Sequence, residues 1–263
     1  MREIPYMHFK RILIIIALLA LIGFMPHAIA QDNDKNDRLA RVALITAKDG
    51  QAKALEKAIT EYHHFMGDKE GAFRYKWYSI ISGPDTGKYI ARSGGHNWAD
   101  FDAEHDWDEE AAAKFASDVQ PHIADVVVTI TQTDDELGIW PESMEGYEYF
   151  SVTKWHIESG KNRAFNDGLK KIDAILKEGD WPSYYTFINT VSGGYGNSVT
   201  IVSPRKSFAD MAPKEPSFFE VMEKAMGEEE TQAFLADLSP NYKSGQNMLL
   251  KYRPKLSDYG DGK

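Results

Sequence analysis

Histidine and acidic side chains gather at two places where they could bind a metal ion. His63-His64 lies in a predicted helix, and the segment 96–106 (HNWADFDAEHD) mixes histidines with acids. These are suitable ligand types for a hard or borderline cation. However, adjacent histidines cannot share one helical face, and acids early in a helix also complement its macrodipole. We therefore expect His63 and His64 on a solvated face, a structural role for 96–106, and no metal site.

Aromatic side chains recur at alternate positions of two predicted strands, 75–81 and 185–191. Because side chains alternate along a strand, one set of these residues shares one face of each sheet. Ligand sites are often apolar with a few placed polar groups. The set either lines a cleft for a small apolar or aromatic molecule or fills the protein interior. It consists of Tyr75, Trp77, Tyr185, Phe187 and Asn189.

Trp155-His156 is a further candidate pair, on the predicted first strand of the second half of the chain. One of the two must face inward because strand side chains alternate. A buried histidine beside a tryptophan could act as a base or an axial ligand, or it could be a core side chain bonded to a backbone carbonyl. Both interpretations remain open, and we include both residues in the candidate ligand site.

The sequence carries no other catalytic signature. It contains no cysteine, which excludes thiol catalysis, iron–sulfur clusters and thiolate-ligated haem. It also contains no Ser-His-Asp order, Walker loop, dinucleotide-binding glycine pattern or HExxH. The net charge of −10 argues against a nucleic-acid partner. The sequence therefore does not decide whether the protein is an enzyme.

Residues 1–30 have the pattern of a signal peptide. Lys10 and Arg11 precede an apolar run, and Ala28-Ile29-Ala30 has the small-x-small form of a cleavage site. The run is too short for a permanent membrane span, and no cysteine follows it to carry a lipid. We expect cleavage near Ala30, a periplasmic or secreted protein, and no stable membrane insertion afterwards.

The rest of the chain consists of two similar halves. Residues 41–102 match 151–212 at an offset of 110, and 115–121 match 234–240 at an offset of 119. Each half contains an apolar stripe with helical spacing. The stripes are Leu55, Ile59, Tyr62 and Met66, and Phe165, Leu169, Ile172 and Leu176.

Each half is predicted to have the order β-α-β-β-α-β, which is the α+β ferredoxin-like topology. A sheet with helices on one face needs a cover on the other, so we expect the two sheets to pack together in a monomer with an internal pseudo-dimer. The predicted segments are a signal peptide (1–30), a flexible leader (31–40), repeat 1 (41–133), a linker (134–148), repeat 2 (149–256) and a tail (257–263).

The segment 155–165 (WHIESGKNRAF) resembles the strand-to-helix entry "PGK…F" of the dimeric α+β barrel superfamily, with Ser159 in place of proline. That group includes the antibiotic-biosynthesis monooxygenases and, as tandem forms, the chlorite dismutases. The resemblance implies a tandem α+β barrel. It leaves three functions open: a binding protein for a small apolar or aromatic molecule, a cofactor-independent monooxygenase or haem enzyme, and a structural or interaction protein with a filled barrel.

Haem is the alternative to a protein without a cofactor. Haem-degrading relatives use an asparagine on a first strand, and neither predicted first strand here carries one. Chlorite dismutase-like activity requires a proximal histidine and a distal arginine. His122 or His156 could be the histidine, but no matching motif surrounds either of them.

Overall fold

The computed structural model describes residues 38–194 and 196–260. The predicted signal peptide and residues 31–37 of the predicted leader lie outside the described residues. No helix within the described ranges is long and apolar enough to cross a membrane.

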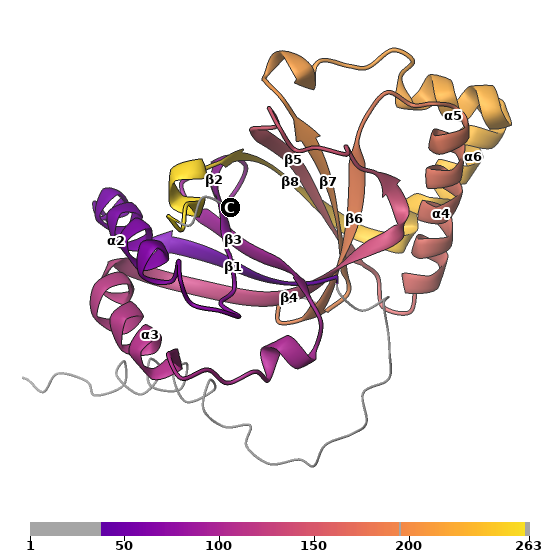
Figure 1. Ribbon diagram of the computed structural model, residues 1–263. Helices are drawn as coiled ribbons and strands as arrows, with labels where there is room; N and C mark the ends of the chain where they lie inside the picture. Colours follow the sequence, from indigo (N-terminus) through magenta and orange to yellow (C-terminus); the bar gives the residue numbers. More distant parts are fainter. Residues whose placement is uncertain (1–37, 195, 261–263) are drawn as a thin grey trace, which may run out of the picture. The chain divides into compact units, whose positions relative to one another are not determined.

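Eight strands form one closed barrel in the described part of the chain (Figure 1). Their order around the barrel is β1-β3-β2-β8-β5-β7-β6-β4, and every neighbouring pair is antiparallel. The strands are β1 (Leu39–Ala47), β2 (Lys76–Ser82), β3 (Tyr89–His96), β4 (Ile123–Ile139), β5 (Tyr149–Ile157), β6 (Tyr185–Ser192), β7 (Ser198–Arg205) and β8 (Tyr242–Tyr252).

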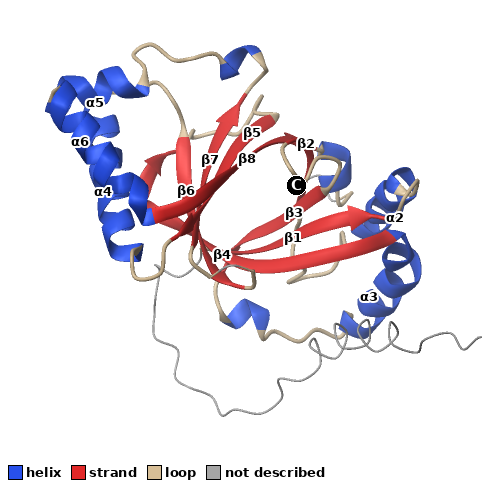
Figure 2. Cartoon of the chain, turned by 180° about the vertical axis from the view of Figure 1, so that it is seen from behind, coloured by secondary structure: helices blue, strands red, loops and turns tan. Residues whose placement is uncertain are grey.

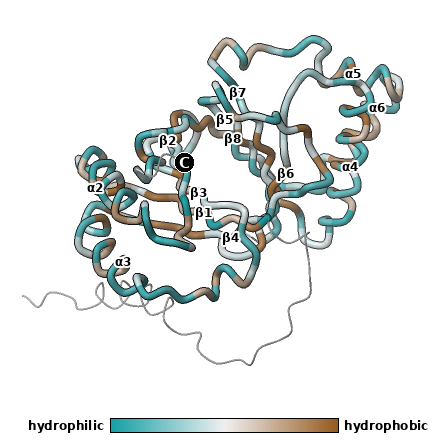
Figure 3. Tube along the Cα trace, in the orientation of Figure 1, coloured by the Kyte–Doolittle hydropathy of each residue, from teal (hydrophilic) through white to brown (hydrophobic). Residues whose placement is uncertain are grey.

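The α-helices lie outside the barrel on two sides, with α2 and α3 over one half and α4, α5 and α6 over the other (Figure 2). They are α2 (Ala52–Phe65), α3 (Asp108–Lys114), α4 (Asn162–Glu178), α5 (Phe218–Met226) and α6 (Glu228–Leu238). Hydrophobic segments run along the strands, whereas α3 is largely hydrophilic (Figure 3). The fold is therefore mixed α+β, with an antiparallel barrel between two groups of helices.

The predicted helical stripes of α2 and α4 face the barrel wall. Leu55 and Ile59 of α2 are buried with Trp77, and Phe165 and Leu169 of α4 are buried with the second set of strands. Burying one such side chain fully adds about 1.5–3 kcal/mol to the free energy of unfolding. The periodicity of the sequence therefore located both helices correctly.

Two seams join the halves of the barrel, and they have the same register. The first seam pairs Tyr78 with Tyr252, Ile80 with Leu250 and Ser82 with Leu249. The second pairs Ile188 with Thr133, Thr190 with Thr131 and Ser192 with Ile130. The β2 and β6 members differ by 110, and the β4 and β8 members by 119. Both seams also shift by one residue at the same point.

The expected packing of the two sheets as a barrel takes the form of pairing between their edge strands. An open sheet leaves unpaired N–H and C=O groups along its edge strands. Here β2 and β8 pair at one edge, and β4 and β6 at the other, so both edges are satisfied. The result is one continuous barrel.

Two predicted boundaries shift in the structure. Leu39 and Ala40, expected in the leader, are buried in β1. β4 runs to Ile139, so residues 134–139 of the expected linker belong to a strand. Between β3 and β4, the helical region consists of a 3-10 turn at Ala99–Phe101, α3, and a π-helical turn at Phe115–Val119.

The expected tail, 257–263, also contributes to the core in its described part. Tyr259 is buried, and its hydroxyl oxygen accepts a hydrogen bond from the Tyr75 N–H at 2.8 Å. The Ser257 hydroxyl oxygen accepts one from the Trp77 N–H, also at 2.8 Å. These bonds satisfy backbone donors at the start of β2. The described part of the expected tail is therefore packed against the barrel.

Candidate functional site

The barrel interior holds a cavity of about 740 Å³ lined by inward-facing side chains from all eight strands. Its volume lies in the range typical of small-molecule sites. Alternate residues of each strand face it, while the residues between them face the helices. The cavity is the strongest candidate site among the described residues.

One wall of the cavity is apolar. Leu250 and Phe150 of the β8–β5 pair are buried there, and the Tyr78 ring meets the Phe150 ring edge-on with centroids 5.2 Å apart. Burial raises the pKa of Tyr78 to about 12, so this phenol stays neutral. The principal residues of the wall are Leu44, Ile90, Phe150, Val152 and Leu250, and Ile80 is packed behind them in the same cluster.

The opposite wall is rich in hydroxyl groups. It is formed by β4, β6 and β7, which are neighbours in the barrel. A threonine hydroxyl both donates and accepts hydrogen bonds, so this wall can adapt to several polar groups. The threonines that line it are Thr129, Thr131, Thr133, Thr186, Thr190 and Thr200.

Arg92 of β3 is a positively charged residue that lines the cavity. It is largely buried, and its Nη2 lies 3.4 Å from the Thr133 hydroxyl oxygen. Burial lowers the pKa of the guanidinium, although it remains charged at neutral pH. A Cβ at Gly94 would come 2.4 Å from Nη1 of Arg92, so the guanidinium needs a glycine there.

Lys154 and His156 of β5 are further basic groups on the cavity wall. Burial lowers the pKa of Lys154. Burial, and then the charge of Lys154, lowers the pKa of His156 below its ordinary value of 6.5. His156 is therefore a neutral imidazole at pH 7, and Lys154 is a cation held in a poorly solvated position.

The acidic residues that border the cavity already have partners. Asp135 is 3.0 Å from Arg38, and Asp85 is 2.7 Å from Lys88. Asp134 accepts backbone hydrogen bonds from the residues that follow it. Within the described ranges, neither Arg92 nor Lys154 forms an ion pair with any of these carboxylates. Arg92 and Lys154 therefore line the cavity without a paired carboxylate among the described residues.

The predicted ligand residues divide between the two faces of the barrel. His156 lines the cavity, and Tyr185 borders it. The aromatic rings of the set pack beneath the helices instead: Tyr75 and Trp77 under α2, and Trp155, Phe187 and the Tyr185 ring under α4. Asn189 lies between Gln132 and Val199 on the adjacent strands, facing away from Ile188.

The predicted choice of face was therefore wrong for most of the set. Amphipathic helices need the bulkiest apolar side chains beneath them, and these are the aromatic residues at the odd-numbered positions of β2 and β6. Tyr78 and Ile188, which the sequence pattern assigned to the opposite face, line the cavity. Arg92 and Lys154 were missed, but they carried a signal, because a charged residue alternating with apolar ones cannot face a packed helix.

His63 is buried, contrary to the expected solvated position. Its ring stacks on Tyr259 with centroids 4.2 Å apart and lies 6.0 Å from Trp77. The returning C-terminal segment covers it, and sequence periodicity carries no information about that contact. His64 remains exposed.

We expect His63 to make stability depend on pH. Burial lowers its pKa from 6.5 to about 4, so the unfolded chain binds a proton at a higher pH than the folded protein. The free energy of unfolding should therefore fall as pH decreases from about 6.5 to 4, by at most about 3 kcal/mol from this group. Denaturant unfolding at a series of pH values checks this. His63→Phe should flatten the slope above pH 5, whereas His64→Gln should not.

The 96–106 segment is held by local contacts. The His96 Nε2 lies 2.7 Å from the Ser93 hydroxyl oxygen, and the His96 ring stacks on Phe73. His105 stacks on Trp107 and contacts Asp108. Across the described residues, no three histidine, aspartate or glutamate side chains cluster closely enough to bind one metal ion.

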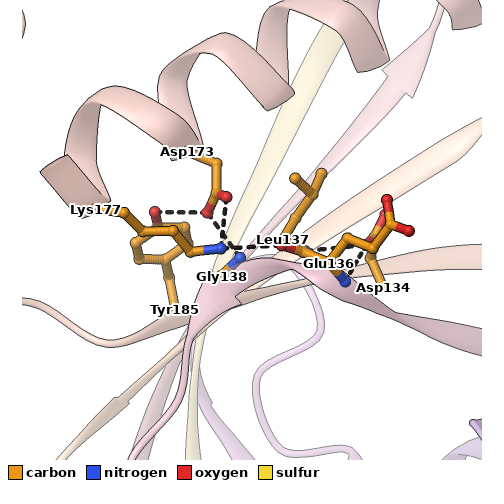
Figure 4. Close-up of polar contacts among 7 residues, drawn as sticks. All are labelled: Asp134, Glu136, Leu137, Gly138, Asp173, Lys177 and Tyr185. Atoms are coloured by element: carbon orange, nitrogen blue, oxygen red, sulfur yellow. Dashed lines mark hydrogen bonds and ion pairs between the residues drawn. The ribbon is translucent and has the colours of Figure 1, made fainter.

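A buried carboxylate fixes the cavity rim to α4 (Figure 4). Asp173 Oδ1 accepts hydrogen bonds from the Gly138 N–H at 2.7 Å and the Tyr185 hydroxyl at 2.9 Å. Lys177 lies 2.8 Å from Oδ2 and donates to the Glu136 carbonyl. Burial and then this carboxylate raise the pKa of Tyr185 far above its ordinary value. The β4 bulge at the rim is thereby held in place.

Solved structures show the same architecture. A Lactobacillus acidophilus protein named for a monooxygenase activity is 9% identical with a TM-score of 0.50, over 82% of this chain and 94% of that one. An anthrone oxidase-like protein is 11% identical with a TM-score of 0.51, over 83% and 92% respectively. The chain has the dimeric α+β barrel fold. A chlorite dismutase from Candidatus Nitrospira defluvii covers 86% of the chain at 8% identity and a TM-score of 0.48. No family model matches the sequence.

The dimeric α+β barrel fold also occurs in haem proteins, so we tested whether the residues present fit haem. A haem needs an axial ligand and apolar contacts on both faces of its ring. His156 shares its strand face with Lys154, and threonines form the adjacent wall. His122 is engaged with the Gln51 side chain at 2.7 Å. These residues fit haem poorly, and we derive no reaction step through it.

Proposed function

We propose that this protein binds a small, largely apolar or aromatic molecule inside the barrel. The observation that carries the proposal is the cavity of about 740 Å³ with one apolar wall. Protein interiors are normally packed to the density of organic crystals, with few voids larger than a water molecule. A space of this size argues against a purely structural protein with a filled barrel.

Enclosure favours a small molecule over a macromolecule. The barrel is closed on all sides by paired strands, so access is through its ends. Trp140 and the β4 bulge border the cavity at the rim. A ligand of about 15–25 heavy atoms fits such a space and can bury most of its surface there.

Filling the cavity with a tryptophan should prevent binding. Ile188→Trp places an indole in the cavity and should weaken binding of the neutral fluorescent probe 9-anthracenecarboxamide by about tenfold or more. Fluorescence titration measures the Kd, and circular dichroism checks the fold. Val191→Trp, at an exposed position of the same strand, is the matched control and should stay within about twofold of the parent. Equal binding by both variants would place the site elsewhere.

We also propose that the chain is a tandem ferredoxin-like repeat that forms its own pseudo-dimer and acts as a monomer after export. The matching registers of the two seams support the repeat. The signal-peptide pattern of residues 1–30 supports export to the periplasm or exterior. Native mass spectrometry of protein purified from the periplasm tests the export and the monomeric state, and it also reveals any copurifying small molecule.

A cofactor-independent oxygenase is the second candidate function. Two structures with the same fold are named for monooxygenase and anthrone oxidase-like activities. In this chain, the neutral His156 imidazole on the cavity wall can accept a proton from an acidic C–H or phenolic O–H group. Oxygen uptake upon addition of anthrone tests this activity, and binding without uptake favours the first proposal.

A further inference from the structure

Some equivalent inward positions on the two sides of the barrel carry opposite chemistry. The register pairs Leu44 with Ile90 in the first half and Lys154 with Thr200 at the corresponding place in the second. At the seams, the Ile80–Leu250 pair corresponds to Thr190–Thr131. At both places, an apolar pair on one side of the cavity thus corresponds to a polar pair on the other side. A ligand that fits both walls must itself be apolar at one side and polar at the other.

The two cations that line the cavity from β3 and β5 indicate the sign of the ligand's polar group. Arg92 and Lys154 make no ion pair among the described residues, whereas the acids at the rim are engaged. A buried cation without a counterion is costly, and an anionic group on a ligand removes that cost. The chain has a net charge of −10, so an excess of basic residues does not explain why two of them line the barrel interior.

Arg92 is positioned to bind a planar anion. The missing side chain at Gly94 gives its guanidinium room against the wall, and the Thr133 hydroxyl holds one nitrogen at 3.4 Å. A guanidinium presents two parallel N–H groups that match the two oxygens of a carboxylate. Thr133 pairs in turn with Ile188, which also lines the cavity.

We propose that the natural ligand is an amphipathic carboxylate, with its acidic group on Arg92 and its apolar body against the wall formed by Leu44, Ile90, Phe150, Val152 and Leu250. This inference rests on the proposed binding function and specifies its ligand class. Polyphosphates and other polyanions do not fit, because Asp134 and Asp135 border the same cavity and would repel the additional charge. Lys154 adds a favourable field across the cavity without being the anchor.

The test compares two probes that differ only in charge. 9-Anthracenecarboxylate and 9-anthracenecarboxamide share the same ring system, and fluorescence titration gives both Kd values. The parent protein should bind the carboxylate about tenfold more tightly. Arg92→Gln should abolish that preference and leave the Kd of the amide within about twofold. Arg163→Gln, at a side chain of α4 that is 96% exposed, makes the same change in net charge and should retain the preference.

The outcomes separate the ligand class from the binding function. If neither probe binds the parent, the proposed binding function fails. If both bind equally, or if Arg92→Gln keeps the preference for the carboxylate, the inference is overturned while the binding function stands. Gly94→Ala gives a second measurement that does not depend on removing a charge. It should displace the guanidinium and reduce the preference at an unchanged melting temperature.

Discussion

Replacing Trp77 with alanine should destabilise the protein by about 3–5 kcal/mol and leave ligand binding in the barrel unchanged. The side chain is only 3% exposed and packs against Leu55 and Ile59 of α2. Its ring also meets Tyr89 edge-on and lies near His63. Removing the indole opens a cavity beneath the helix that these neighbours cannot fill.

Denaturant unfolding measures the loss, and titration with 9-anthracenecarboxamide measures binding by the remaining folded protein. Trp77→Phe is the conservative control, because it keeps most of the volume and removes an indole N–H that has no hydrogen-bond partner. It should cost about 1 kcal/mol. A Trp77→Ala protein that keeps its stability but binds the probe about tenfold less tightly would place this residue in the ligand site and contradict the assignment of faces.

Periodicity alone predicted the helices and most strands, because it reports which residues share a face. It does not report which face of a strand meets the helices. Trp77 and Tyr78 are adjacent aromatic residues, and nothing in their types distinguishes a helix-facing position from a cavity-facing one. The decision depends on contacts with α2, whose Leu55 and Ile59 lie 22 and 18 residues before Trp77 in the chain. Arg92 carried the missing information, since it alternates with Ala91 and cannot lie beneath a helix.

The superfamily resemblance implied a barrel, but the pairing of its edge strands and the return of the C-terminal segment were not predictable from periodicity. Both depend on contacts between residues far apart in the sequence, such as Tyr75 with Tyr259 and Tyr78 with Tyr252. The duplication did indicate that the halves associate, because a sheet with helices on one face must cover the other. The duplication did not indicate that the edge strands of one half would pair with those of the other half.

Replacing Asp173 with alanine should be about as costly as the loss of Trp77, about 3–5 kcal/mol, because two hydrogen-bond donors lose their buried acceptor. The carboxylate is 3% exposed and accepts hydrogen bonds from the Gly138 N–H and the Tyr185 hydroxyl. Alanine leaves both donors without this partner. The ion pair to Lys177 adds little, because that side chain is 40% exposed and solvent screens it.

Two variants separate these contributions. Asp173→Asn keeps an oxygen acceptor and should lose about 1–3 kcal/mol. Asp167→Asn removes an exposed acid from the same helix and should change stability by less than about 0.5 kcal/mol. Hydrogen exchange should show faster exchange of the Gly138 amide in Asp173→Ala, since β4 is bulged there and needs the anchor. An unchanged Gly138 exchange rate would mean that the rim is fixed by the strand pairing alone, and that the network seen in Figure 4 stabilises α4 without positioning the cavity mouth.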